Sequence, residues 1–170
     1  AGWGHSTVGL GLRQKLDRNS DSTFVMPHVR QAITDAFGRI VPISLRYNTG
    51  FMDAAVRASV RDRVTFFWRF EDDPLMGAGG PAPEMEAGLA EMEAAIIAAI
   101  PGDGGSLVAV RLGNGMVEYA VAFFSDAAHE SFAENFEPPE VFFNKFAAQQ
   151  FEHGHEFWPE YLPKGFETEG

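Results

Sequence analysis

The sequence predicts an α+β fold in which an antiparallel sheet carries helices on one of its faces. Residues 63–70 alternate apolar side chains onto one side, as a half-buried strand does. Residues 83–100 repeat apolar side chains at helical spacing, and two apolar runs flank a Gly-Asn-Gly turn at 113–115, as in a β-hairpin. With a further helix and strand after the hairpin, the order from residue 63 is strand, helix, hairpin, helix, strand. This order is typical of the split βαβ, ferredoxin-like arrangement.

The segment before residue 63 is predicted to add a helix and a strand to this sheet. Residues 1–23 are rich in Gly, Ser and charge and predict a flexible arm, which leaves residues 24–170 as a single α+β domain. RIVPISLRY (39–47) reads as a strand, and Pro42 places it toward an edge because proline has no N–H to donate. MPHVRQAITDAFG (26–38) predicts a helix that ends at Gly38. Its apolar positions at helical spacing are Val29, Ala32, Ile33, Ala36 and Phe37.

The strand at 63–70 is followed by a predicted loop and an amphipathic helix. EDDPLMGAGGPAP (71–83) concentrates acidic residues, Pro and Gly, which is typical of a loop. Pro83 suits the first position of a helix, where its missing N–H costs nothing. One buried stripe is expected from Met85, Leu89, Met92, Ile96 and Ile100, and the glutamates Glu84, Glu86, Glu91 and Glu93 are expected to point away from it.

The remaining elements are shorter. Ser125 is predicted to cap a helix on which Phe132 and Phe136 share a face. After the Pro138-Pro139 pair, EVFFNKFAAQQ (140–150) predicts one or two helical turns, and residues 149–157 predict an extended segment.

Composition and charge restrict the function. The 170 residues contain no cysteine, which removes disulfides, thiol catalysis and zinc–thiolate sites. The net charge of −11 is uneven: residues 1–69 carry ten Lys and Arg against five Asp and Glu, and residues 70–170 carry three against nineteen. Such an acidic part repels phosphate backbones, so direct binding to nucleic acid is not expected. No apolar run approaches a membrane span, and a cytoplasmic location is expected.

The acidic loop and helix are the predicted partner-binding surface. We expect a basic protein surface to meet these side chains by charge complementarity. The alternative is an acidic surface that only keeps the protein soluble. A homodimer through an exposed sheet edge is a further possibility. The candidate residues are Glu71, Asp72, Asp73, Glu84, Glu86, Glu91 and Glu93.

FEHGHEF (151–157) is the one candidate metal site. On a strand, His153 and His155 would point to the same face, as two imidazole ligands of a transition metal must. Glu152 and Glu156 would then point to the opposite face and could not complete the ligand set. The alternative, which the pattern favours, is an acidic strand with an aromatic row. The sequence shows no catalytic constellation, and no cofactor is expected.

Four stretches of the chain form a familiar combination: VTFFWRFEDD, PAPEMEAGLAEMEAAI, LVAVRLGNGMVEYAVAFFSD and the ending Trp158-x-x-Tyr161-Leu162-Pro163. Over about residues 40–163 the chain resembles the uncharacterised bacterial family known as domain of unknown function number 695. The Gly-rich arm at 1–23 and the EHGHE stretch depart from it. The family's fold is similar to that of small acidic regulators, notably the RraB-type protein inhibitors of a bacterial endoribonuclease. The resemblance implies no catalytic residue.

These observations lead to one expected function and two alternatives. The expected function is a non-enzymatic, acidic module that binds and regulates another protein. The first alternative is a metal-binding protein that uses His153 and His155. The second is an enzyme of unrecognised type with a pocket between the sheet and the helices.

Overall fold

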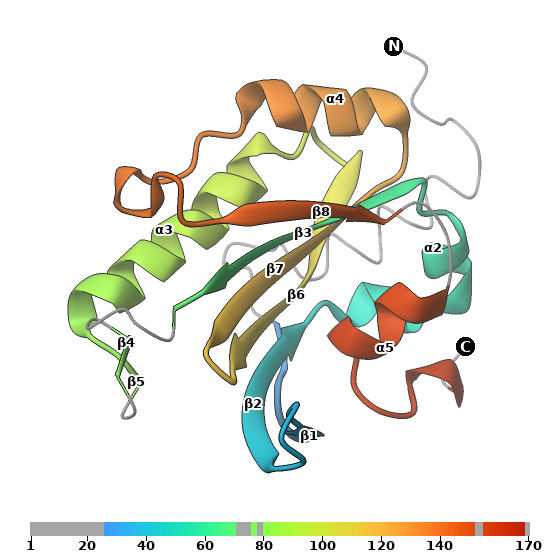
Figure 1. The fold of residues 1–170 in the computed structure, drawn as a ribbon. Coiled ribbons are helices and arrows are strands. Elements are labelled where there is room, and N and C mark those ends of the chain that lie inside the picture. Colours follow the sequence, from blue (N-terminus) through green and yellow to red (C-terminus); the bar gives the residue numbers. More distant parts are fainter. Residues whose placement is uncertain (1–25, 71–75, 78–79, 152–154, 169–170) are drawn as a thin grey trace.

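A six-stranded antiparallel sheet forms the centre of the protein. The computed structural model describes residues 26–70, 76–77, 80–151 and 155–168. Within them the strand order is β1-β2-β6-β7-β3-β8, and every neighbouring pair runs antiparallel (Figure 1). The strands are β1 (His28–Thr34), β2 (Ile40–Tyr47), β3 (Asp62–Arg69), β6 (Gly105–Gly113), β7 (Met116–Phe123) and β8 (Ala147–Phe151). The predicted α+β class is therefore correct.

The chain from β3 to β8 follows the predicted order of strand, helix, hairpin, helix and strand. Strand β3 leads through a two-stranded ribbon, β4 (Met76–Gly77) with β5 (Gly80–Pro81), into helix α3 (Pro83–Ala99). The hairpin β6–β7 follows, and Asn114 and Gly115 between its strands both adopt positive φ angles. A two-residue turn of this kind matches the right-handed twist of the strands that it joins. Helix α4 (Asp126–Asn135) then leads to β8, which pairs with β3.

Helices α3 and α4 cover one face of the sheet (Figure 1). The predicted stripe of α3 is confirmed, because Met85, Met92 and Ile96 are at most 1% exposed. They pack against the large side chains on this face of β3 and β7, and the stacked rings of Phe132 and Phe136 complete the cluster. The side chains that β3 and β7 contribute are Val64, Phe66, Trp68, Val117, Tyr119, Val121 and Phe123.

The opposite face of the sheet is also covered, so the prediction of helices on one face is wrong. The 3-10 helix η1 (Thr49–Met52), helix α2 (Ala54–Ala58) and helix α5 (Trp158–Tyr161) contribute a second buried cluster, which includes Phe51 and Trp158. The 3-10 helices η3 (His155–Phe157) and η4 (Phe166–Thr168) flank α5. Strand β7 shows the reason, because Ala120 and Ala122 on this face leave room that aromatic rings fill.

Two predicted elements are corrected. Residues 26–38 are not a helix: they form β1 and the turn into β2, with positive φ at Gly38. Because β1 pairs with β2 and β2 with β6, this hairpin extends the sheet beyond β6, and β2 lies inside the sheet instead of at its edge. Pro42 is tolerated because the pairing of β2 with β6 begins only at Ile43.

The chain after α4 differs from the prediction as well. Only the 3-10 helix η2 (Glu140–Phe142) is helical between residues 136 and 146, and β8 begins at Ala147. Of the predicted extended segment 149–157, residues 149–151 belong to β8, residues 152–154 lie outside the described residues, and His155–Phe157 is a 3-10 helix. Among the described residues, no helix is both long enough and apolar enough to cross a membrane. The predicted arm at 1–23 lies outside the described residues.

Candidate functional site

The predicted acidic surface lies on the helical side of the sheet. Helix α3 begins at Pro83, and Glu84 and Glu86 in its first turn lie near the positive end of the helix dipole. Neither α3 nor α4 contains Lys or Arg. We call the exposed carboxylates of these two helices the acidic layer: Glu84, Glu86, Glu91, Asp126, Glu130 and Glu134. The predicted residues Glu71, Asp72 and Asp73 lie outside the described residues.

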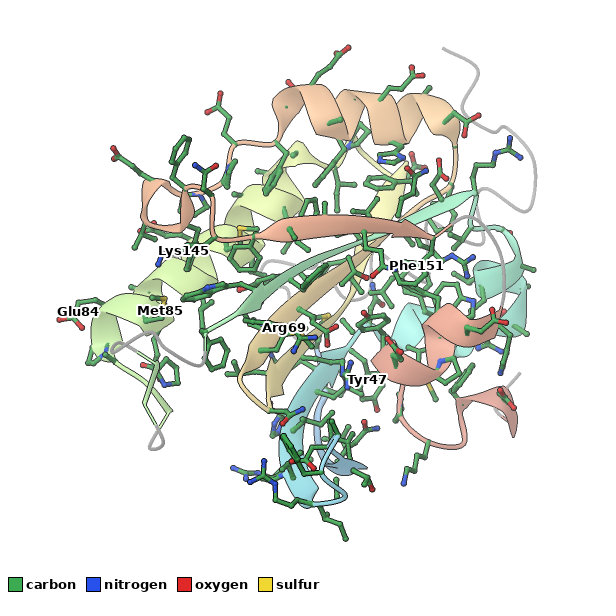
Figure 2. The ribbon with its side chains drawn as sticks, in the orientation of Figure 1. Tyr47, Arg69, Glu84, Met85, Lys145 and Phe151 are labelled. Carbon is green, nitrogen blue, oxygen red and sulfur yellow. The ribbon has the colours of Figure 1, made fainter. Side chains whose placement is uncertain are left out.

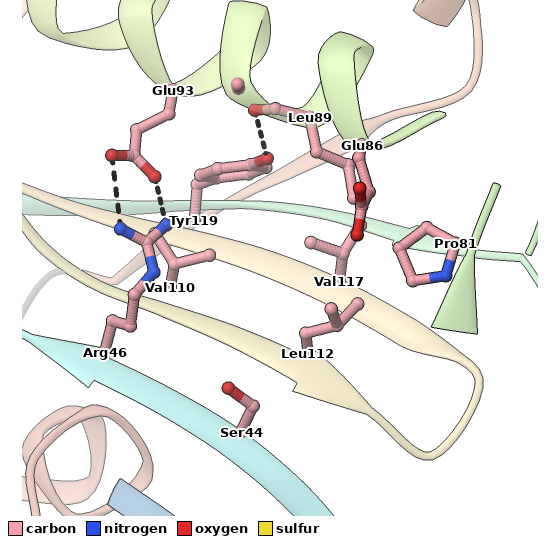
Figure 3. Close-up of a pocket in the computed structure, with 11 residues that line it drawn as sticks. Ser44, Arg46, Pro81, Glu86, Leu89, Glu93, Val110, Leu112, Val117 and Tyr119 are labelled. Carbon is pink, nitrogen blue, oxygen red and sulfur yellow. Dashed lines mark hydrogen bonds and ion pairs between the residues drawn. The ribbon is translucent and has the colours of Figure 1, made fainter. Parts of the chain in front are cut away.

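Glu93 does not belong to the acidic layer, which corrects the prediction for this residue. It turns toward the sheet and forms an ion pair with Arg46 of β2, with side-chain exposures of 17% and 36% (Figure 3). Within this pair, Nη1 of Arg46 lies 3.4 Å from Oε2 of Glu93. The contact joins α3 to the β1–β2 hairpin and neutralises one glutamate of the helix.

A groove of about 420 Å³ lies between α3 and strands β2, β6 and β7 (Figure 3). Val110, Leu112 and Val117 make its floor apolar, and the Arg46–Glu93 pair, Glu86 and Ser44 add polar groups. It lies between the sheet and a helix, where the alternative of an unrecognised enzyme expected a pocket. Its lining is apolar on the floor and polar at the Arg46–Glu93 side.

Tyr119 lies at the base of this groove. Its hydroxyl donates a hydrogen bond of 2.9 Å to the backbone carbonyl of Leu89 in α3. Burial raises the pKa of Tyr119 far above its ordinary value, and the charge of Glu93 raises it further. The hydroxyl is therefore protonated at neutral pH, and its hydrogen bond ties β7 to α3.

One pair of side chains in this region has the geometry of a nucleophile and its base. Nε2 of His28 on β1 lies 2.7 Å from Oγ of Ser44 on β2, at the rim of the groove. An activated serine also needs a group that orients the histidine. No such acidic partner of His28 is found in the described part of the chain. The pair was missed because residues 26–38 were predicted as a helix, which would not place His28 beside Ser44.

A buried polar network occupies the opposite face of the sheet. Nη1 of Arg111 donates to Glu118 at 2.7 Å, and the hydroxyl of Tyr161 donates to the same carboxylate at 3.2 Å. Thr65 in turn donates to the Tyr161 hydroxyl at 3.3 Å. Burial raises the pKa of Glu118, and the charge of Arg111 opposes that shift. The network links β3, β6 and β7 to α5, and Thr65, Glu118 and Tyr161 are all buried.

The predicted metal site is not assembled as the strand pattern implied. His155 lies in η3, where its ring stacks on Phe166 with 6.0 Å between ring centres and Nε2 pairs with the carboxylate of Glu167. His153 lies outside the described residues. Within the ranges that the structure describes, no group of three His, Asp or Glu side chains is arranged to hold a metal ion. Metal binding by His153 and His155 stays a prediction.

The described residues therefore define an α+β protein with helices on both faces of its sheet and an acidic layer on one of them. Comparisons of the chain with protein-family models, with curated proteins and with solved structures found no match.

Proposed function

We propose that the protein is a non-enzymatic binding module whose acidic layer docks on a basic surface of another protein. The observation that carries the proposal is the charge of α3 and α4, which lie side by side over one face of the sheet and carry only acidic charges. A surface of one sign raises the rate of encounter with a partner of the opposite sign and disfavours other partners.

Most of these carboxylates are not neutralised within the protein. Asp126 pairs with Arg61 at 3.3 Å, and both side chains are about two-thirds exposed. Glu84, Glu86 and Glu91 form no ion pair with any described residue. The charges of these three glutamates are therefore available to a partner. The charge of Asp126 is available as well, because an exposed ion pair contributes little to stability and exchanges readily.

Exposed apolar side chains lie beside the acidic layer. Val141 lies in η2 and Phe143 directly follows it, and their side chains are 45% and 74% exposed. A Cβ added at Gly88 of α3 would lie 3.2 Å from Val141, so this apolar group adjoins the helix that carries Glu84 and Glu91. Protein interfaces combine apolar and aromatic contacts with a polar rim. Figure 2 shows Glu84 and Lys145 in this region of the surface.

The proposal extends to the fold. Strands β3, β6, β7 and β8 stand in the order β6-β7-β3-β8 and are linked as strand, helix, hairpin, helix, strand. This supports a ferredoxin-like unit at residues 62–151, to which the β1–β2 hairpin is added beside β6. The proposal includes a cytoplasmic partner protein and is compatible with the small acidic regulators whose fold the expected family shares, although a shared fold does not set function.

Partner capture with charge-matched variants tests this proposal. The immobilised full chain is exposed to a bacterial lysate at low salt, beside the variants Glu84→Gln/Glu91→Gln and Glu156→Gln/Glu160→Gln. Both variants lose two exposed carboxylates, but the second pair lies at η3 and α5, on the opposite face of the sheet. We expect a basic protein that is retained by the native chain and by the second variant, and lost from the first. Equal retention by both variants would contradict the proposal.

A further inference from the structure

A second groove, of about 380 Å³, lies between α4 and the last strand of the sheet. Its walls are mostly apolar. Val64 and Phe66 come from β3, Phe132 from α4, Phe136 from the position just after α4, and Ala148 from β8. His129 and Gln150 are its polar members. The register of β8 against β3 places Ala148 opposite Phe66 and Gln150 opposite Val64, so alternate residues of β8 face this groove.

Strand β8 is an open edge of the sheet within the described part of the chain. It pairs with β3 on one side, and no other described strand pairs with it. The residues Ala147–Gln150 are all exposed. In an antiparallel edge strand, alternate residues direct their N–H and C=O groups away from the sheet. The edge can therefore accept a further strand through main-chain hydrogen bonds.

The polar end of the groove holds a carboxylate. Asp62 of β3 accepts a hydrogen bond of 3.2 Å from Gln150, and its other carboxylate oxygen lies 3.3 Å from Nδ1 of His129. The His129 ring stacks on Phe123, with 4.7 Å between ring centres. Glu130 and Glu134 of the acidic layer are exposed and follow the groove-lining His129 and Ala133 by one position each on α4. An apolar groove thus has a carboxylate at one end, and the helix above it carries exposed glutamates on its outer side.

We propose that the edge of β8 binds an extended segment of the partner as an added strand. Alternate apolar side chains of this segment enter the groove under α4, and its Lys or Arg side chains meet Asp62, Glu130 and Glu134. The inference rests on the proposed function, because it names the element of the basic partner that docks. A second copy of this chain is a poor occupant, since pairing of β8 with β8 would bring two acidic α4 helices together.

The test uses a short labelled peptide in which Lys alternates with Val and Leu, and measures its binding to the full chain by fluorescence anisotropy at about 0.1 M salt. The variant Ala148→Phe fills the groove. Its matched control is Ala147→Phe, an exposed neighbour whose side chain points to the other face of β8. Thermal unfolding establishes that both variants keep the fold. A third arm leaves the protein unchanged and methylates alternate backbone nitrogens of the peptide.

We expect Ala148→Phe to weaken binding by about tenfold or more, because one buried apolar side chain contributes that much. Ala147→Phe is expected to bind as the native chain does. Methylation of the nitrogens that face β8 is expected to abolish binding, because they can no longer donate to the edge.

Three results of the peptide assay would overturn the inference. They are no binding to the native chain, equal binding to the Ala148→Phe and Ala147→Phe variants, and full binding of the methylated peptide. If the peptide binds both variants equally but is weakened by Glu84→Gln/Glu91→Gln, the acidic layer is still the docking surface and only the added strand is wrong. Self-association that Ala148→Phe disrupts would identify a second copy as the occupant and also overturn the inference.

Discussion

The buried pair of Arg111 and Glu118 provides a quantitative test of the polar network that lies between the sheet and α5. The guanidinium and the carboxylate are 2.7 Å apart, and their side chains are 14% and 10% exposed. The perturbations are Arg111→Met, Glu118→Leu and the double variant, which together make a double-mutant cycle. Each single variant leaves one charge in the sheet without its partner.

The structure sets the expected magnitudes. Removal of one member of a buried ion pair costs about 3–5 kcal/mol of unfolding free energy, and the residual exposure here favours the lower end. The double variant replaces both charges with apolar groups, which is often neutral or stabilising. Tyr161 then loses its acceptor on Glu118, at a cost of about 1–3 kcal/mol. We therefore expect the double variant to lie within about 2 kcal/mol of the native chain.

Urea unfolding with linear extrapolation measures these free energies. The account predicts that the two single losses sum to well above the loss in the double variant, with a coupling of at least about 2 kcal/mol. Single losses below about 1 kcal/mol that simply add would refute the reasoning, because that behaviour belongs to an exposed, hydrated pair.

Three further perturbations have expected outcomes. The first is Glu118→Gln: because the pKa of Glu118 is raised, the folded native protein keeps a proton on this carboxyl at pH values above 4.5, where the unfolded chain has released it. Urea unfolding should therefore show the native protein losing stability relative to the variant as the pH rises from 4.5. A gain in stability relative to the variant would contradict this. Ser125→Ala removes the oxygen that accepts from the N–H of Ala128 at 3.0 Å and should cost about 1 kcal/mol by urea unfolding, whereas no loss would mean that the cap is dispensable. Gly88→Leu places side-chain atoms against Phe142, which lies 3.2 Å from the added Cβ, and should lower the unfolding free energy by about 1–3 kcal/mol. An unchanged urea midpoint would show that η2 moves away freely.

Local chemistry made much of the fold predictable. The turn at Asn114 and Gly115 needs positive φ at both residues, and the Gly-Asn-Gly stretch predicts such a turn without any information from distant residues. Pro83 at the start of α3 and Ser125 at the start of α4 are similarly local signals. These elements were predicted because their boundaries depend on side chains close by in the chain.

The first strand was mispredicted because its pattern suits two structures. Val29 and Ile33 are four residues apart, so they share a face of a helix and equally share a face of a strand. In the structure, pairing with β2 at every position from His28 to Thr34 decides between the two. Such pairing joins residues far apart in the sequence, and the spacing of apolar residues in one segment does not contain it.

The candidate site was predictable in charge but not in its contacts. The excess of acidic residues after residue 70 is a count. The helical spacing of the apolar stripe then correctly predicted that Glu84, Glu86 and Glu91 are exposed. The partner of Glu93 is Arg46, 47 positions earlier, and a helical period cannot reveal that contact. The hydrogen bond between His28 and Ser44 depends in the same way on the β1–β2 pairing.

The affinity of a captured partner for the two charge-matched variants tests the central claim most directly. Titrations at about 0.1 M and about 1 M salt span a fall of the Debye length from about 10 Å to about 3 Å. If the acidic layer is the docking face, Glu84→Gln/Glu91→Gln weakens binding by about three- to tenfold at the lower salt, and the difference from the native chain disappears at the higher salt. Glu156→Gln/Glu160→Gln should bind as the native chain does at both. Equal weakening by the two variants, or a loss of affinity that salt does not change, would contradict the claim that this layer recognises a basic partner.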